Sequence, residues 1–147
     1  MSNSEHTYLG KKFQEAVCEW FASESEYKGS FEMEVGLPIG SPEKDHFFDI
    51  VNKEAKIVIE CKRYTWTETG NVPSAKIRSL NEAAFFLTSM EPSLKDSYTK
   101  YIVMFKANHP KKKESLAEYY FKTYHNLLGD IILAEYDVIK KEMRYFK

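Results

Sequence analysis

Apolar residues follow helical spacing in three stretches of the chain. Residues 9–21 carry Leu9, Phe13, Ala16, Val17, Trp20 and Phe21 on one face. In residues 74–87 the same spacing joins Ile77, Leu80, Ala84 and Leu87, with Ser74 before the pattern and Pro92 after it. The third helical stretch covers residues 114–128 and is followed by Gly129, a favourable residue for ending a helix. The pattern therefore predicts three helices, with Ser74 at the start of the second and Pro92 as its stop.

Five shorter stretches have the pattern of strands. Residues 27–35 alternate weakly and lead into the turn-rich residues 36–45, for which we expect an exposed loop. HFFDIV (46–51) and KIVIECK (56–62) flank a turn at residues 52–54 and predict a hairpin of central strands. YIVMF (101–105) predicts a strand covered on both faces, and IILAEY (131–136) predicts the last strand. The expected order is α-β-β-β-α-β-α-β, with residues after 137 too few to interpret.

Length and composition fit one α/β domain that spans residues 1–147. Apolar residues make up 43% and charged residues 29% of the chain, as in ordinary globular proteins. No apolar run approaches the ~20 residues of a membrane span, and the N-terminus lacks the pattern of a signal peptide. We therefore expect no membrane partner and a cytoplasmic location. Cys18 and Cys61 fall inside expected regular elements, which favours buried thiols over a disulfide or a zinc site.

The overall charge gives no electrostatic attraction toward nucleic acid. The chain has 21 basic and 22 acidic residues, a net charge of −1. Basic residues do cluster locally, at Lys62, Arg63, Lys76 and Arg78 and again at residues 111–113. Such clusters are compatible with nucleic-acid binding but are more often solvated loops.

The chemistry that the sequence predicts centres on Asp49, Glu60 and Lys62. Side chains alternate along a strand, so Glu60 and Lys62 share one face and Cys61 points to the other. Two buried carboxylates on adjacent strands repel one another, and a divalent cation relieves that repulsion. Mg²⁺ fits best because it binds one or two carboxylates together with waters and phosphate oxygens. The backbone carbonyl of Cys61 is a further possible ligand.

Lys62 would stand beside the metal and the phosphate, where its ammonium can orient a water and offset transition-state charge. Phosphodiester hydrolysis needs a metal-activated water, charge neutralisation and in-line positioning of the attacking group. The alternative is a set of structural ion pairs at strand ends, which are common in α/β proteins and which an isolated Glu-x-Lys triplet would favour.

The combination of an Asp in an apolar strand, a short turn and IVIECK resembles the PD-(D/E)xK nuclease superfamily, in a Mrr-like or Holliday-junction-resolvase-like form. The resemblance covers about residues 9–105. It implies a restriction-endonuclease-like αβββαβ core, a mixed central sheet flanked by helices. It further implies that Asp49 and Glu60 bind the metal and that Lys62 is the catalytic lysine.

Two departures from the family pattern affect the first helix and the first acidic residue. Where the family often has G-x-x-F-E, this chain has Gly10-Lys11-Lys12-Phe13-Gln14 followed by Glu15, so either Gln14 or Glu15 would serve the site. Phe48, not proline, precedes Asp49.

Several further residues are candidates for substrate contact. Arg63, Ser74, Lys76 and Arg78 are expected to hold the DNA backbone, the last three from the start of a helix. Tyr64 and Trp66 would either stack on bases or pack against the core. Asp45 is expected at a polar strand entrance, and His46 and His109 on the surface.

The leading hypothesis is a homodimeric endonuclease that cuts DNA with Mg²⁺, for which Mn²⁺ would substitute, and needs no small-molecule cofactor. The runner-up is a catalytically inert nuclease-like fold that binds nucleic acid or a protein, as the near-neutral charge and Gln14 suggest. The third is an α/β domain in which Asp49 and Glu-x-Lys are structural.

Overall fold

Six strands form one mixed sheet whose spatial order follows the chain, β1-β2-β3-β4-β5-β6. The computed structural model describes residues 2–24 and 26–147. Strands β1, β2 and β3 are antiparallel, β3, β4 and β5 are parallel, and β6 returns antiparallel to β5. The strands are β1 (Glu32–Ile39), β2 (Lys44–Asn52), β3 (Ile57–Lys62), β4 (Thr99–Phe105), β5 (Ile132–Asp137) and β6 (Glu142–Tyr145).

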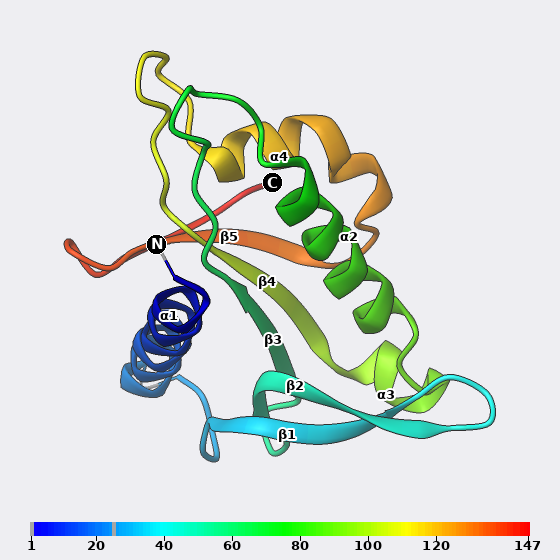
Figure 1. Ribbon diagram of the computed structural model, residues 1–147. Coiled ribbons are helices and arrows are strands. Elements are labelled where there is room, and N and C mark those ends of the chain that lie inside the picture. The colour runs from blue at the N-terminus through cyan, green and yellow to red at the C-terminus, as the bar shows by residue number, and fades with distance from the viewer. Residues whose placement is uncertain (1, 25) are drawn as a thin grey trace.

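Helices cover both faces of this sheet (Figure 1). Helix α1 (Asn3–Ser23) lies on one face. The two parallel crossovers pass over the other face, the first through α2 (Ser74–Thr88) and α3 (Pro92–Ser97), the second through α4 (Leu116–Tyr124) and the short 3₁₀ helix η1 (His125–Leu127). Because parallel crossovers share one handedness, consecutive crossovers in the same direction fall on the same face.

Two hydrophobic clusters hold these layers together. On the α1 face, Phe13, Val17 and Phe21 pack against inward residues of β2, β3 and β4 such as Ile59 and Val103. On the other face, the apolar sides of α2 and α4 meet Phe48, Val58 and Ile102. Strands β3 and β4 are therefore buried on both sides, which confirms the expectation from the continuous apolar run at 101–105.

The expected loop at residues 36–45 is wrong. Strand β1 continues through Gly36–Ile39, and β2 already begins at Lys44, so only residues 40–43 form the turn. Strand β1 lies at the edge of the sheet, where Pro38 needs no backbone donor for a second neighbour. Turn-forming residue types thus misled the sequence interpretation, because an edge strand tolerates them.

Helix α2 begins at Ser74, as expected, with Pro73 as its N-cap and no side chain capping it. Two smaller expectations also need correction. Pro92 does more than mark a stop, since it opens α3. The last helix ends as an α-helix at Tyr124, and β6 follows what was expected to be the final strand.

Within the described residues, no helix combines the length and the apolar character that crossing a membrane requires. Both cysteines are free, and both are half-buried, where buried thiols were expected.

Candidate active site

Asp49 lies where strand β2 departs from regular pairing. Phe48 and Val51 both pack toward α2, whereas Ile50 packs toward α1, so the strict alternation of faces is broken beside Asp49. On the neighbouring strand β1, Glu34 has a left-handed backbone with φ 57°, and no pair is formed between it and Asp49. The irregularity leaves the backbone and the side chain of Asp49 available to other partners.

Those partners come from β3 and from α1. The backbone N–H of Cys61 donates a hydrogen bond to Asp49 Oδ2 (2.8 Å). The Gln14 side chain donates through Nε2 to the carbonyl oxygen of Asp49 (3.0 Å). The Asp49 carboxylate is thus fixed against the end of β3, on the strand that carries Glu60 and Lys62.

Glu60 is the buried acid of the site, with 5% of its surface exposed. Extending the register of Ile50 opposite Ile59 by one residue brings Asp49 opposite Glu60. Burial, followed by the neighbouring Asp49 carboxylate, raises the pKa of Glu60 to about 9, against a smaller lowering by Lys62. Only one of the two carboxylates expected to be buried is therefore buried, because Asp49 and Lys62 are partly exposed on the neighbouring cleft.

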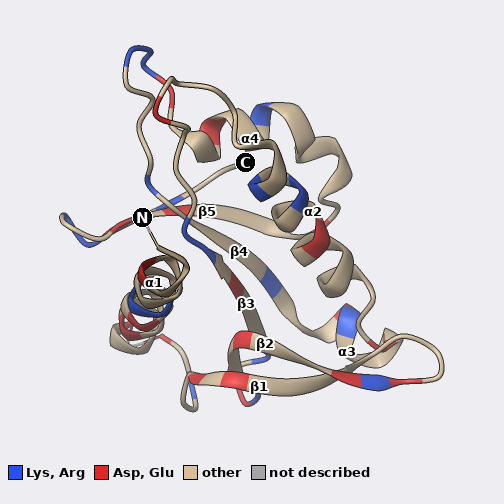
Figure 2. Ribbon diagram, in the orientation of Figure 1, with Lys and Arg blue, Asp and Glu red and all other residues tan. Residues whose placement is uncertain are grey.

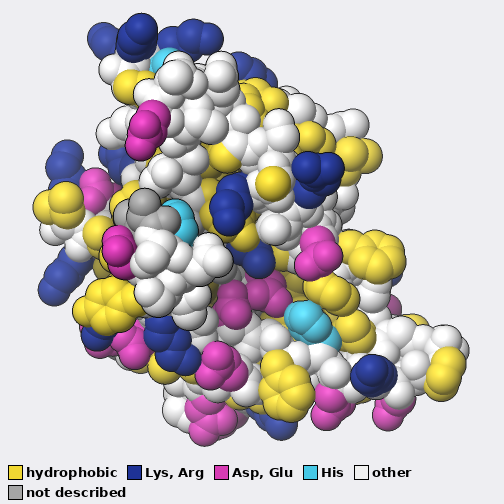
Figure 3. Space-filling model, viewed as in Figure 1, with side chains coloured by type: hydrophobic (Ala, Val, Ile, Leu, Met, Phe, Trp, Pro, Cys, Tyr) yellow, Lys and Arg dark blue, Asp and Glu magenta, His cyan; other side chains and the backbone are white. Residues whose placement is uncertain are grey.

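A cleft of about 420 Å³ opens beside these residues. Asp49, Cys61 and Lys62 form its floor, α1 contributes Gln14 and Gly10, and the segment after β3 contributes Arg63, Tyr64, Pro73 and Lys76. Figure 3 shows acidic side chains at the centre of this face, with basic side chains above them and a histidine beside them. The cleft lies at the carboxyl end of β3, the end of a parallel strand where α/β proteins commonly bind ligands.

The two candidate residues of α1 behave differently. Gln14 is 8% exposed and reaches the site through the Asp49 carbonyl, as described above. Glu15 instead pairs with Lys12 (3.5 Å) on the outer side of the helix and does not line the cleft. The structure therefore brings Gln14 to the site and leaves Glu15 away from it.

The expected substrate contacts divide in the same way. Arg63 and Lys76 line the cleft, and Lys76 lies 5.4 Å from the centre of the Tyr64 ring. Ser74 and Arg78 open onto a different depression, between α2 and α4. Trp66 packs into the fold, where its Nε1 donates to the carbonyl of Ala107 (3.0 Å), so the core alternative holds for this residue.

His46 was expected on the surface, but it is only partly exposed and reaches the candidate site. Its Nε2 lies 3.4 Å from Glu60 Oε1, and its ring stacks on Phe86 at 4.1 Å between centroids. Burial is the main influence that lowers the pKa of His46, so the ring is neutral at pH 7 and its contact with Glu60 is a hydrogen bond. The one available signal was strand alternation, which puts His46 on the same face as Phe48.

The remaining candidates, His109 and Asp45, do not line the cleft. Nδ1 of His109 accepts from the N–H groups of Lys111 and Lys112, and its Nε2 contacts the carbonyl of Gly70 (2.8 Å), so the ring holds two loops together. Asp45 is exposed opposite Pro38 at the entrance of β2, as the polar interpretation predicted.

The donors available for a metal are few. In the described ranges 2–24 and 26–147, no three His, Cys, Asp or Glu side chains are grouped so as to hold a metal ion. A cation between Asp49 and Glu60 would thus have two side-chain ligands. Burial, followed by Asp49 and Glu60, raises the pKa of the Cys61 thiol well above its usual value, which leaves the carbonyl as the ligand that Cys61 can offer.

Comparison of the chain with protein-family models, with curated proteins and with solved structures gave no match.

Proposed function

We propose that this chain is a metal-dependent endonuclease with a restriction-endonuclease-like core that hydrolyses DNA phosphodiester bonds. The observation that carries the proposal is the crowding of the buried Glu60 against Asp49, with Lys62 on the same cleft. A buried carboxyl group held against a second carboxyl group is unfavourable in its ionised form in a metal-free protein. Such an arrangement is expected where a divalent cation completes the site.

The donor set fits Mg²⁺, with Mn²⁺ as a substitute. Asp49 and Glu60 would hold the ion through carboxylate oxygens, and the Cys61 carbonyl is a third possible oxygen ligand. Mg²⁺ favours one or two protein carboxylates and fills its remaining positions with waters and substrate phosphates. When bound, such an ion polarises a phosphoryl oxygen and lowers the pKa of a coordinated water.

The residues of the cleft supply the remaining functions. Lys62 would stabilise negative charge on the phosphate as the attacking oxygen approaches. Arg63 and Lys76, on the wall of the same cleft, would hold the phosphates on either side of the one attacked. His46 and Gln14 would orient the site, the first through Glu60 and the second through the Asp49 backbone.

We further propose that two copies act together on a DNA duplex. One chain offers one such cleft among its described residues, and a single compact site cuts one strand. Light scattering with a duplex in Ca²⁺, which we expect to support binding without cleavage, should give two chains per duplex. One chain per duplex would restrict the protein to nicking.

The direct test measures cleavage of plasmid and of branched DNA with Mg²⁺. Asp49→Asn should reduce cleavage to the background rate, and Lys62→Ala should reduce it by about 10²–10³-fold, as for other lost transition-state donors. Asp45→Asn is the matched control, because it changes an exposed aspartate on the same strand. Equal activity in wild type and in both site variants would remove the proposal.

An inert nuclease-like fold that binds nucleic acid or a protein is the second candidate, and the polar Gln14 in place of an acid favours it. Titration with Mn²⁺ separates the two, since an inert fold should show no binding that depends on Asp49.

A further inference from the structure

A second pocket lies near the carboxyl ends of β4 and β5, apart from the cleft at Asp49. It has a volume of about 470 Å³. We call it the Glu135 pocket and define it by Lys106, Lys112, Lys113, Glu118, Glu135 and Arg144, which are among its lining residues. Figure 2 shows basic residues on the loops that extend beyond this end of the sheet.

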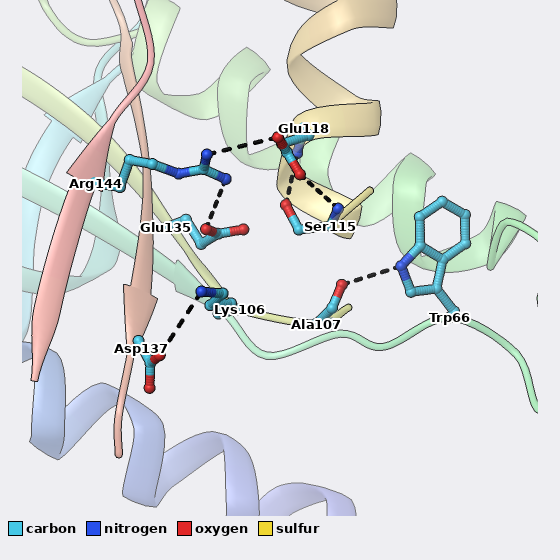
Figure 4. A network of polar contacts seen from close by, with 8 residues as sticks. All are labelled: Trp66, Lys106, Ala107, Ser115, Glu118, Glu135, Asp137 and Arg144. Carbon is cyan, nitrogen blue, oxygen red and sulfur yellow. Dashed lines mark hydrogen bonds and ion pairs between the residues drawn. The ribbon is translucent and has the colours of Figure 1, made fainter. Parts of the chain in front are cut away.

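Glu135 is a buried acid with one unused oxygen. The residue is 2% exposed. Its Oε1 accepts a hydrogen bond from Arg144 Nη2 (2.8 Å), whereas its Oε2 is shielded from solvent and has no hydrogen-bond partner among the described residues. Figure 4 shows this second oxygen turned away from Arg144. Because a buried acceptor without a partner is unfavourable, Oε2 is suited to a donor supplied from outside the chain.

The surrounding contacts hold Glu135 in place. Arg144 bridges Glu135 to Glu118, whose Oε2 lies 3.5 Å from Arg144 Nη1. Glu118 is itself fixed by the reciprocal hydrogen bonds with Ser115 that cap α4 (Figure 4). The Arg144 side chain itself is half exposed.

Two exposed lysine side chains line the pocket. Lys112 and Lys113 are exposed, and neither forms an ion pair within the described part of the chain. Two of the acidic lining residues are already matched, Asp137 by Lys106 (3.8 Å) and Glu114 by Lys122 (2.8 Å). The pocket therefore combines an acceptor inside with unpaired ammonium groups outside, which suits a ligand that has a donor at one end and an anion at the other.

Strand register connects this pocket to the candidate active site. Lys62 pairs with Met104, Met104 pairs with Glu135, and Glu135 pairs with Arg144. Residues in register across adjacent strands face the same side of a sheet, and two strand spacings amount to about 10 Å. Glu135 thus lies on the same face as Lys62, about two strand spacings away, with the buried Met104 between them.

We propose that the Glu135 pocket binds a nucleobase that carries an exocyclic amino group on its major-groove edge, cytosine at N4 or adenine at N6. The amino group donates to Glu135 Oε2, and Lys112 and Lys113 meet the phosphate of the same nucleotide. The assignment of that nucleotide to the DNA strand being cut rests on the proposed nuclease function. Base binding itself does not depend on it.

The test is titration of metal-free protein with dCMP, dAMP, dTMP and inorganic phosphate, followed by amide shifts in NMR spectra. We expect dCMP and dAMP to bind about tenfold more tightly than dTMP, because one charged hydrogen bond separates them. The amide of Glu135 should shift with dCMP and not with phosphate. Equal binding of all three nucleotides, as expected if a water fills the place beside Oε2, would overturn the proposal.

Glu135→Gln sharpens the test. A carboxamide keeps an oxygen for Arg144 and turns an N–H into the pocket, so the preference should move from dCMP to dTMP, whose O4 accepts. Glu142→Gln is the matched control, since it removes an exposed carboxylate at the same pocket and should leave the base preference unchanged. An unchanged preference in a folded Glu135→Gln protein would also overturn the proposal. If this variant does not fold, the nucleotide comparison in the wild type decides alone.

The two proposals can fail separately. Asp49→Asn should lose cleavage and keep the preference for dCMP over dTMP. Cleavage with no base preference would overturn the pocket alone, and base preference without cleavage would overturn the nuclease alone.

Discussion

Glu60 links the stability of the folded protein to pH through the proton on its carboxyl group. Its pKa, raised to about 9 by burial and by Asp49, means that the folded metal-free protein keeps a proton that the unfolded chain releases near pH 4.5. Between these two values unfolding releases a proton, so the stability contributed by this group is complete below pH 4.5 and is lost as the pH rises toward 9.

The first prediction follows from that linkage. In a chelator, the free energy of unfolding of the wild type should fall relative to Glu60→Gln by up to about 1.4 kcal/mol per pH unit between pH 5 and pH 8. Urea unfolding at several pH values measures it. Glu43→Gln, which changes an exposed glutamate, should follow the wild type. Parallel curves for the wild type and Glu60→Gln would show that Glu60 titrates normally.

The second prediction concerns His46, which contacts Glu60 from β2. His46→Phe keeps a ring to stack on Phe86 but removes the N–H, so Mg²⁺ affinity should fall about 10–100-fold, as for lost partners of metal ligands elsewhere. His46→Gln keeps a donor and should retain most of the affinity. Calorimetric titration compares the two. Equal losses in both variants would contradict a specific role of the His46 N–H.

At the residue scale, the sequence predicted part of the candidate site and missed part of it. Strand alternation correctly separated Glu60 from the Cys61 thiol, which packs toward α1. It did not reveal His46, because the stack that holds this ring comes from Phe86 on a helix forty residues away in sequence. It also could not show that a break in β2 pairing frees Asp49, since that break depends on the left-handed backbone of Glu34.

At the scale of elements, α1 is attached to the site through one polar contact. Gln14 satisfies the Asp49 carbonyl that lacks a strand partner, which makes this side chain part of how the helix docks on β2.

The third prediction tests that contact. Gln14→Ala leaves a buried carbonyl without its donor and should lower the free energy of unfolding by about 1–3 kcal/mol. Glu15→Ala, at the adjacent position, removes only a partly exposed pair with Lys12 and should cost less than about 0.5 kcal/mol. Denaturant unfolding measures both. Similar effects at the two positions would mean that Gln14 contributes no specific bond.

Element boundaries were predictable where local chemistry decides them and not elsewhere. Ser115 and Glu118 form a capping box that fixes the start of α4 close to the expected position. By contrast, the Gly36–Ile39 segment extends β1 because β2 lies beside it, and β6 forms because β5 offers a free edge. These strand pairs join separate segments of the chain, so neither segment carries a local sequence pattern that predicts them.

At the scale of the whole molecule, a net charge of −1 requires DNA binding to be local. The fourth prediction is that Lys76→Ala weakens duplex binding in Ca²⁺ and reduces the slope of log affinity against log salt by about one unit. Lys95→Ala, an exposed lysine on α3, should change neither quantity. Fluorescence anisotropy at several salt concentrations measures both slopes. Identical affinities and salt slopes for the two variants would contradict the binding of DNA in the cleft.

The order of the strands and longer helices up to β5 and the α/β class were predictable because long amphipathic helices and continuous apolar strands have distinct periods, whereas the short α3 was missed. The mixed six-stranded sheet bears out that class. Its spatial order was not available from those periods, since strand pairing depends on contacts between distant segments. The restriction-endonuclease-like assignment remains a proposal that rests on Asp49, Glu60 and Lys62.

The central claim is that Asp49 and Glu60 share one divalent cation. Anomalous diffraction from crystals soaked in Mn²⁺ above pH 8, with Asp49→Asn crystals as the comparison, tests it most directly. The wild type should show one strong peak within coordination distance of both carboxylates, and the variant should show none there. No peak between these side chains, or the same peak in both crystals, would contradict it.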